Sequence, residues 1–523
     1  MSDRGLRTFF QVGHALSLRG AAQRFTAASR DQARCQDRLL RQTLSKNSET
    51  AYGKAHGFSR ISSFAEFQAK VPIVDYDALA PEIARITQGE QNVLTKAPVL
   101  AFEPSGGSTQ TTKLVPYTQQ LLDEFGAATS PWLFDLYKHR RGLFGTQSYW
   151  SVSAVAQRET KTAGGTRIGL GDDTAYFGPL TRIALRRMLA VPGSVAREPS
   201  MHAWQEATLD HLVAAEDLGL ISVWSPSFLT LLMVALEKTW KDRCLSHKRW
   251  QAIDARLQRA GRFVGEALWP RLTLLSAWTH GPAAALLPAM QHYFPTTELQ
   301  GKGLLATEGV VTVPLFGAPA PVAAVTSHVL EFIDLVAPTR APLRVFQLVA
   351  GGEYSPVLTT GGGFYRYHLK DVVRCEGHYR ELACLRFISK LDRVSDLVGE
   401  KINAHQMEHA LETTKQHGAT FEFALLAPLP GTPATYCLFI ESDLSDAAIA
   451  SVRDEVEAYL RTGHHYRYAR SLGQLGPMQV RRVRDGHRTF HNTLVAIGQK
   501  AGDIKPTGLD SRTLWAEAFL NVS

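Results

Sequence analysis

The stretch Ser105-Gly106-Gly107-Ser108-Thr109-Gln110-Thr111-Thr112-Lys113 decides how the fold of this chain is interpreted. It lies between two strand-like segments, Ala97–Glu103 and Leu114–Tyr117. Small residues let backbone N–H groups approach an anion, and hydroxyl side chains add further donors. A lysine at the end of such a loop supplies a point charge for phosphate. The stretch therefore predicts a phosphate-binding loop for a nucleotide such as ATP, and a plain solvated turn is the alternative.

The residues that follow the loop exclude a Walker-type site. That motif requires Gly-Lys-Ser/Thr at the start of a helix, whereas here Leu114-Val115-Pro116-Tyr117 follows the lysine. A proline in this position is incompatible with a helix interior. A helix is predicted to begin later, with Thr118 as its N-cap before Gln119–Phe125. Lys113 is therefore expected on a strand that leaves the loop.

The composition is that of a globular protein with more than one domain. The chain has 523 residues, of which 45% are hydrophobic and 20% are charged. The 57 Lys and Arg exceed the 49 Asp and Glu, and the formal net charge is +8. This modest surplus suits anionic small molecules and does not require nucleic acid as a partner.

The cysteines and the apolar segments indicate a cytoplasmic protein without a membrane span. The five cysteines are widely spaced and form no Cys-x-x-Cys pair, so neither a disulfide framework nor a zinc site is indicated. The region Met1–Arg30 is expected to be an ordinary first helix rather than a transit peptide. The segment Leu218–Leu236 carries too many serines for a membrane span, and Ser225-Pro226 is expected to begin a buried helix there.

Two patterns follow one another along the chain. Strand and helix signals alternate up to about residue 390, which predicts a large α/β domain with mixed sheets and helices over residues 1–390. After that, helix patterns at Ala404–His417 and Ser445–Thr462 flank strand patterns at Phe421–Ala427 and Tyr436–Glu441. The second region, residues 391–523, is therefore predicted to form a small α+β domain.

Two further segments carry candidate chemistry. Thr307-Glu308-Gly309 places a carboxylate beside a glycine-rich apolar segment, and such a carboxylate is a reasonable Mg²⁺ ligand. The segment from Gly361 to Asp371 combines glycines, aromatic rings and an aspartate that could accept from both ribose hydroxyls. A surface turn and an ordinary hairpin, respectively, are the alternatives for the two segments.

The order and spacing of these segments resemble the adenylate-forming superfamily, which includes acyl-CoA synthetases, peptide-synthetase adenylation domains and luciferase. Within it, the chain most resembles the auxin-responsive acyl acid–amido synthetase family, from about residue 45 to 510. The segments that carry the resemblance, besides the opening loop, are Thr50–Phe58, Val71–Tyr76, Val223–Phe228, Leu304–Gly309, Gly363–Val373, Tyr466–Arg470 and Gly502–Pro506.

The resemblance implies a role for each matching residue and the use of ATP and Mg²⁺. Contacts to the ATP phosphates are implied for Ser105, Gly106, Gly107, Ser108 and Lys113. Contacts to the nucleotide are implied for Thr307 and Tyr365, a Mg²⁺ ligand for Glu308, a ribose contact for Asp371, and a phosphate or ribose contact for Lys390. Lys505, on a mobile C-terminal domain with its hinge near Asp392, would reach the reacting oxygens during adenylation.

The chain departs from the family pattern at two positions. Gln110 stands where the superfamily loop has glycine, and Lys390 stands near a position where the family often has arginine. Neither departure removes a charge or a carboxylate. Activity is therefore expected to persist.

The implied reaction joins a carboxylic acid to an amino acid through an acyl-adenylate. Attack of a carboxylate on the α-phosphate needs alignment and charge neutralisation more than a protein nucleophile. A thiol acceptor such as CoA, and a catalytically silent nucleotide-binding regulator, are the alternatives. Four tryptophans are candidates for the acid pocket, although buried aromatic residues are more often plain core: Trp132, Trp150, Trp224 and Trp278. The acid, the amine and the oligomeric state are not encoded in these motifs.

Overall fold

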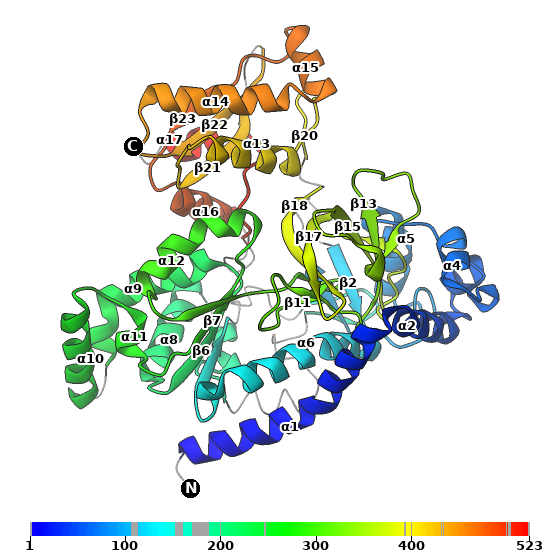
Figure 1. Cartoon of the computed structure of the whole chain (residues 1–523), viewed down its shortest axis with the longest axis horizontal. Helices are drawn as coiled ribbons and strands as arrows, with labels where there is room; N and C mark the ends of the chain where they lie inside the picture. The colour runs from blue at the N-terminus through cyan, green and yellow to red at the C-terminus, as the bar shows by residue number, and fades with distance from the viewer. Residues whose placement is uncertain are drawn as a thin grey trace. The chain divides into compact units, whose positions relative to one another are not determined.

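The computed structural model describes residues 3–105, 113–151, 160–169, 188–198, 200–244, 247–391, 394–398, 400–429, 431, 433–497, 499, 501 and 504–520. The fold is α/β, as predicted, and the chain divides into two compact units (Figure 1). Unit 1 comprises Met1–Trp278, Ala289–Leu369 and Val373–Arg386. Unit 2 comprises Thr279–Pro288, Lys370–Val372 and Phe387–Ser523.

The α-helices are distributed over both units. In chain order up to the last sheet of unit 1 they are α1 (Asp3–Arg30), α2 (Gln32–Asn47), α3 (Ala51–Ala55), α4 (Phe64–Lys70), α5 (Tyr76–Thr87), α6 (Gln119–His139), α8 (Met201–Ala214), α9 (Pro226–Arg243), α10 (His247–Ala260), α11 (Gly265–Leu268) and α12 (Leu287–Tyr293). Those that follow are α13 (Ala404–Gln416), α14 (Asp446–Leu460), α15 (His464–Ser471), α16 (Gly486–Ala496) and α17 (Trp515–Leu520). None of the helices that the structure describes has the length and apolar character to cross a bilayer.

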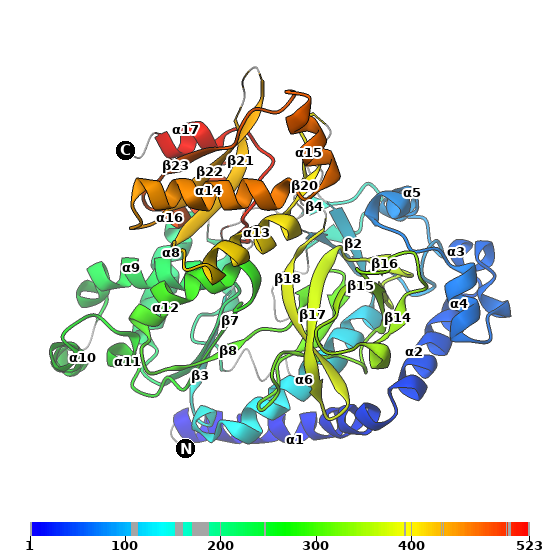
Figure 2. The same ribbon diagram turned by 45° about the horizontal axis from the view of Figure 1, so that its top comes forward.

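Helix α1 packs along α6, as both views show (Figures 1 and 2). The predicted first helix is therefore confirmed. Its contact with the rest of unit 1 combines polar and apolar groups. Gln11 Nε2 donates to the carbonyls of Leu143 at 3.1 Å and Thr146 at 3.0 Å, and Leu18 and Phe25 are buried in the core. The apolar side chains of Phe9 and Leu16 are instead 68% and 63% exposed. The helical spacing of apolar residues thus predicted the helix correctly, but it did not predict which face of the helix is buried.

The first two sheets of unit 1 include the strands that flank the predicted phosphate loop. One has the order β2-β1-β5-β4, with β1 (Ala101–Ser105), β2 (Lys113–Tyr117), β4 (Thr160–Lys161) and β5 (Arg167–Ile168). The other has the order β3-β6-β7-β8, with β3 (Gln147–Trp150), β6 (Leu218–Ser222), β7 (Leu274–Ala277) and β8 (Glu298–Gly301). All neighbours in this second sheet are parallel. Its central strands β6 and β7 are buried throughout, as expected of a parallel sheet.

A larger, eight-stranded sheet follows along the chain. Its order is β11-β12-β18-β17-β15-β13-β14, and β16 pairs with β15. The strands are β11 (Thr312–Val313), β12 (Val322–Ala323), β13 (Val329–Asp334), β14 (Leu343–Arg344), β15 (Glu353–Thr359), β16 (Tyr367–His368), β17 (Asp371–Tyr379) and β18 (Leu382–Lys390). A short antiparallel pair, β9 (Leu305–Ala306) and β10 (Gly309–Val310), precedes it.

Unit 2 contains a three-stranded sheet covered on both faces. Strand β22 (Thr435–Glu441) pairs antiparallel with β21 (Phe423–Leu429) and parallel with β23 (Gln479–Arg482). Alternate residues of a strand point to opposite faces. Leu438 and Ile440 therefore pack with α13 and α14, whereas Phe439 packs with α16 and α17. The predicted α+β character of this region is confirmed. A separate antiparallel pair, β19 (Val394–Ser395) and β20 (Ile402–Asn403), precedes α13.

Capping residues account for the helix starts that the sequence predicted. Thr118 Oγ1 accepts from the N–H of Leu121 at 3.2 Å, so α6 begins where predicted. Ser445 caps α14 in the same way through Ala448. Helix α9 begins at Pro226 as predicted but extends to Arg243, beyond the expected end near Leu236.

A buried ion pair joins the eight-stranded sheet to the N-terminal helices. Arg366 donates to both carboxylate oxygens of Glu331 at 3.0 Å, and the two side chains are 4% and 1% exposed. The same guanidinium donates to the carbonyls of Gln68 at 2.8 Å and Val71 at 2.7 Å. Removing one partner of a buried pair leaves an uncompensated charge, which is far costlier than losing an exposed pair.

Arg366→Met is expected to lower the free energy of unfolding by about 3–5 kcal/mol, because Glu331 then stays buried without its cation. Arg386→Met is the matched control, since the pair of Arg386 with Glu376 is about one third exposed on each side. That control should cost less than about 1 kcal/mol. Urea unfolding followed by tryptophan fluorescence measures both, and equal losses would contradict the assigned role of Arg366.

Candidate functional site

The two ends of the predicted phosphate loop lie opposite each other on adjacent strands. Ser105 ends β1 and pairs with Lys113, which begins β2, in antiparallel register. The lysine is thus on a strand leaving the loop, as predicted. Gly106, Gly107 and Ser108 lie outside the described residues, so their predicted contacts with phosphate stay a prediction. Gln110, the departure from the family pattern, lies outside them as well.

Tyr76 fixes the start of β2 beneath the candidate lysine. Its hydroxyl accepts from the N–H of Leu114 at 2.7 Å, and Lys113 Nζ lies 5.7 Å from the centre of its ring. Burial raises the pKa of Tyr76, and the nearby negative charges of Asp77 and Glu308 add to this shift. The hydroxyl is therefore a neutral phenol at physiological pH, and it holds the backbone that carries Lys113.

Thr307 and Glu308 form the turn between β9 and β10, because Ala306 and Gly309 are paired across it. Tyr117 donates its hydroxyl to the Thr307 carbonyl at 2.6 Å, and Tyr367 donates to Glu308 Oε1 at 3.4 Å. Glu308 is half-buried. A half-buried carboxylate on a held turn, next to a hydroxyl, offers the oxygen ligands that Mg²⁺ prefers.

The glycine-rich segment before β16 is clamped from α6. Thr118 donates to the carbonyl of Gly361 at 2.8 Å, and a Glu124 carboxylate oxygen accepts from the Gly361 N–H at 2.8 Å. The same carboxylate oxygen lies 2.9 Å from Nδ1 of buried His328. One helix therefore fixes both polar groups of the Gly361 backbone.

Tyr365 does not present its side chain to a ligand. It is fully buried, donates to the carbonyl of Leu94 at 2.7 Å and stacks on Tyr52 with ring centroids 5.1 Å apart. The resemblance implied a nucleotide contact for this residue, and the burial does not support it. The physical reason is that the ring fills the core between the glycine-rich segment and helix α3, where Phe58 also packs against it.

Three of the predicted site residues belong to unit 2. Asp371, at the start of β17, pairs with Lys390, at the end of β18, at 2.7 Å. The Asp371 side chain is 3% exposed and that of Lys390 is 25% exposed, so the pair is largely withdrawn from solvent. Lys505 is exposed and follows Ile504, which is buried in the core of the unit. The predicted ribose-contact residues Asp371 and Lys390 are thus brought together.

The residues that sequence reasoning missed are the tyrosines that hold this site. Tyr76, Tyr117 and Tyr367 each use a hydroxyl to fix a backbone segment or a carboxylate of a predicted site residue. No spacing distinguishes such tyrosines from core aromatic residues. Tyr76 and Tyr367 do lie inside segments that carry the family resemblance, which was the available signal.

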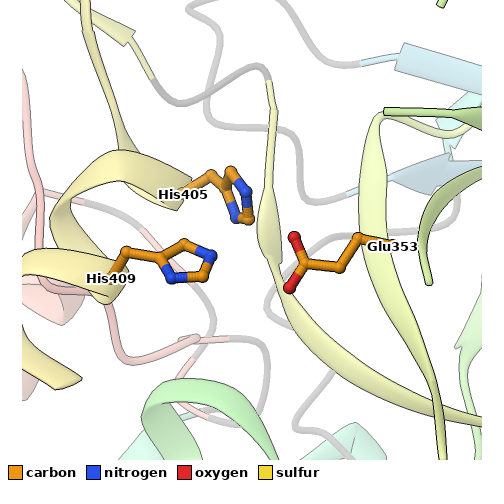
Figure 3. A group of neighbouring side chains, drawn as sticks. All are labelled: Glu353, His405 and His409. Carbon is orange, nitrogen blue, oxygen red and sulfur yellow. The ribbon is translucent and has the colours of Figure 1, made fainter. Parts of the chain in front are cut away.

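Two histidines of α13 form a separate titratable group in unit 2. His405 and His409 have ring centroids 4.5 Å apart, and both are drawn in Figure 3. His405 Nδ1 lies 3.3 Å from Ser389 Oγ. Glu353, also labelled there, belongs to unit 1, where it accepts from Arg374 at 2.7 Å. Two imidazoles of one unit are fewer ligands than a zinc site has, so no metal is assigned to them.

Comparison with known protein families identifies the chain. The GH3 family N-terminal domain matches residues 21–248, the GH3 family central domain matches residues 322–390, and the GH3 family C-terminal domain matches residues 405–509. Together these matches cover more than half of the chain. The chain belongs to the GH3 family. This confirms the resemblance to acyl acid–amido synthetases that the motifs indicated.

Relatives of this GH3 chain match over nearly their whole length. A probable indole-3-acetic acid-amido synthetase, GH3.12 of Oryza sativa subsp. japonica, is 24% identical, with 92% of each chain covered. A jasmonoyl–L-amino acid synthetase, JAR6 of Nicotiana attenuata, is 21% identical, again with 92% of each chain covered. Among solved structures, the GH3.15 acyl acid amido synthetase superposes with a TM-score of 0.78 at 19% identity, covering 96% of this chain and 95% of that chain. That superposition shows that the fold is shared.

Tyr117→Phe is expected to destabilise this GH3 chain by about 1–3 kcal/mol, because the half-buried Thr307 carbonyl loses its donor. Tyr149→Phe is the matched control. Tyr149 is also fully buried in unit 1, but its hydroxyl has no hydrogen-bond partner among the described residues. Removing that hydroxyl should therefore cost nothing measurable. Thermal unfolding compares the two variants, and equal effects would mean that the Tyr117 hydroxyl does not hold the turn.

Proposed function

We propose that this GH3 chain is an ATP-dependent ligase that joins a carboxylic acid to an amino acid. The observation that carries the proposal is that three tyrosines hold candidate site residues in unit 1 of a GH3 chain. Tyr76 lies against Lys113, Tyr117 donates to the Thr307 carbonyl, and Tyr367 donates to Glu308. A cation for phosphate and a carboxylate for Mg²⁺ are the groups that phosphoryl chemistry requires, and no protein nucleophile is needed.

The reaction has two steps. First, a carboxylate oxygen of the acid attacks the α-phosphorus of ATP, the bond to the β-phosphate oxygen breaks, and pyrophosphate leaves. Second, the amine nitrogen of the amino acid attacks the acyl carbon, and AMP leaves with the electron pair of the broken bond between the acyl carbon and the phosphate oxygen of the mixed anhydride. The amine loses a proton, and an amide results.

The proposed roles follow the chemistry of each side chain. Ser105, Gly106, Gly107, Ser108 and Lys113 bind the phosphates, and Thr307 contacts the nucleotide. Glu308 would hold Mg²⁺, which would neutralise phosphate charge when bound. Asp371 would accept from ribose hydroxyls, with Lys390 holding its carboxylate in place, and Lys505 would stabilise the oxygens that gain charge during adenylation.

The proposal divides these roles between the two predicted domains. Residues 1–390 would bind ATP and the acid, and residues 391–523 would form a mobile domain that carries Lys505. Movement of the smaller domain would shield the acyl-adenylate from water until the amine attacks. The five cysteines are free thiols, which suits a reducing cytoplasm.

The proposed function is tested by a pyrophosphate-release screen with ATP, Mg²⁺ and a panel of aryl, indole and fatty acids. Mass spectrometry of the products, with pooled amino acids in one arm and CoA in the other, identifies the acceptor. An amide in the first arm is expected. A thioester found only with CoA would assign the alternative acceptor. No pyrophosphate with any acid would reject the ligase proposal.

Lys505→Ala is expected to reduce pyrophosphate release by at least about 10²-fold, since it removes a preorganised positive charge from the developing transition state. Lys415→Ala is the control, because Lys415 is an exposed lysine of the same unit. Both variants should unfold at the same temperature as the parent chain. Unchanged turnover in Lys505→Ala would contradict the role proposed for Lys505. ATP binding by the parent chain without any pyrophosphate release would support a silent nucleotide-binding regulator instead.

A further inference from the structure

The parallel sheet of unit 1 carries a row of side chains that crosses all four strands. Trp150 is in register with Ser222, Ser222 with Ser276, and Ser276 with Gln300. Residues in register on parallel neighbours point to the same face. The row therefore lines one face of the sheet, near the carboxyl ends of its strands. This edge is where open α/β sheets bind ligands.

A lysine and one further tryptophan extend this row beyond the ends of two of the strands. Lys302 and Trp224 each lie two residues beyond a row member, and hence on the same face. The ladder continues to these residues, because the Lys302 N–H donates to the Ala277 carbonyl at 2.8 Å. The backbone hydrogen bond of Lys302 to the neighbouring strand thus sets the direction of its side chain.

Lys302 sits in a box of three tryptophans. Its Nζ lies 4.9 Å from the ring centre of Trp224, 5.5 Å from that of Trp132 and 5.6 Å from that of Trp150. The same nitrogen donates to Ser222 Oγ at 2.7 Å. The residue is 7% exposed, and burial lowers the pKa of Lys302 to about 7. Among the described residues, no carboxylate forms a salt bridge with it.

Two further donors of the row have no partner. Ser276 Oγ and Gln300 Nε2 are buried and make no hydrogen bond in the part of the chain that the structure describes. The other amide atom of Gln300, Oε1, is held by Trp132 Nε1 at 2.9 Å, which fixes the orientation of the side chain. An unpaired buried donor lowers the stability of the fold by about 1–3 kcal/mol. Such groups are rare in folded proteins, and a bound water or ligand is one explanation for them.

We propose that Lys302, Ser276 and Gln300, together with the tryptophans Trp132, Trp150 and Trp224, bind a ring-bound oxygen substituent of an aromatic carboxylic acid. The Ser276 hydroxyl, the Gln300 amide N–H and the Lys302 amine can all donate, so the group that the site takes is an acceptor oxygen: a phenolic oxygen or a second carboxylate. The tryptophan faces provide the flat apolar surface that an aromatic ring fills. This assignment rests on the proposed function and narrows its acid substrate to oxygen-substituted aryl acids.

The site takes the substituent and not the carboxylate that reacts. The candidate phosphate and Mg²⁺ residues, Lys113 and Glu308, lie on strand β2 and on the β9–β10 turn. Ser276 and Gln300 lie on the β3-β6-β7-β8 sheet, and Lys302 directly follows strand β8. A carboxylate paired with Lys302 would be held at that sheet. An acid anchored there by its ring substituent keeps its carboxylate available for the nucleotide.

The direct test is binding without ATP. Benzoate is compared with 2-, 3- and 4-hydroxybenzoate and with terephthalate by tryptophan fluorescence and by calorimetry. The parent chain is expected to bind at least one substituted acid about tenfold or more tightly than benzoate, since a site with unpaired donors rejects analogues that lack the acceptor. Equal binding of all five acids, or binding of none, would overturn the proposal.

Three variants assign the effect to the named atoms. Lys302→Met removes the cation at similar length, and it should abolish the preference for the substituted acid while benzoate binding changes less than about twofold. Gln300→Glu keeps the acceptor for Trp132 and replaces the free donors by a carboxylate that pairs with Lys302, so the preference should also disappear. Ser276→Ala deletes one donor at little change in volume, and should reduce the preference about three- to tenfold. A preference that survives in Lys302→Met, with folding verified by circular dichroism, would overturn the assignment.

The binding test separates this site from the ligase activity. If a substituted acid binds through Lys302 but no pyrophosphate is released, the binding site stands and the proposed function fails. If pyrophosphate is released only with acids that carry no ring oxygen, the proposed function stands and the substrate assignment fails.

Discussion

The buried pair of Arg366 and Glu331 is the interaction on which much of unit 1 depends. Taking two charges out of water is costly, and the cost is offset only when the geometry is good and the remaining hydrogen-bonding groups are satisfied. Here the guanidinium is bidentate to the carboxylate, and its remaining nitrogen donates to the carbonyls of Gln68 and Val71 at the end of α4. One side chain thus joins strand β13, an N-terminal helix and the glycine-rich turn.

That turn also determines where the neighbouring aromatic rings go. Tyr365, immediately before Arg366, points into the core against Tyr52, and Tyr367, immediately after it, reaches Glu308. Tyr365 and Tyr367 are two residues apart and would share one side of an extended segment. Arg366 between them has a φ of 49°, in the left-handed region, so the segment is not extended and the two rings point differently. The contacts that hold Arg366 in place therefore also position its two neighbours. The ring of Tyr365 packs in the core, and the hydroxyl of Tyr367 donates to Glu308, the candidate metal ligand.

The candidate site is held largely by neutral hydroxyls. Tyr76 binds the backbone of β2, Tyr117 binds the Thr307 carbonyl, and Thr118 binds the Gly361 carbonyl. Burial raises the pKa of Tyr76, so this phenol adds no charge that would compete with phosphate or Mg²⁺. The charged side chains of the site are therefore available to interact with the ligands. Electrostatic stabilisation of a phosphoryl transition state requires this arrangement. The surroundings of Lys302 are similar, because its amine is enclosed by uncharged hydrogen-bonding side chains and aromatic faces.

The sequence by itself determined the elements, their order and the family. Helix caps such as Thr118 and Ser445, and the spacing of apolar residues in α14, depend on residues that are close together in the chain. They can therefore be predicted from the sequence, and the order of the motifs can be read from it directly. It could not determine which face of α1 is buried, that Tyr365 packs the core, or that tyrosines hold Thr307 and Glu308. Only the tertiary structure decided that Trp150, Ser222, Ser276 and Gln300 form one row. Their alignment depends on the register of four parallel strands joined by long crossovers, and register is set by packing across the sheet and not by neighbours in the chain.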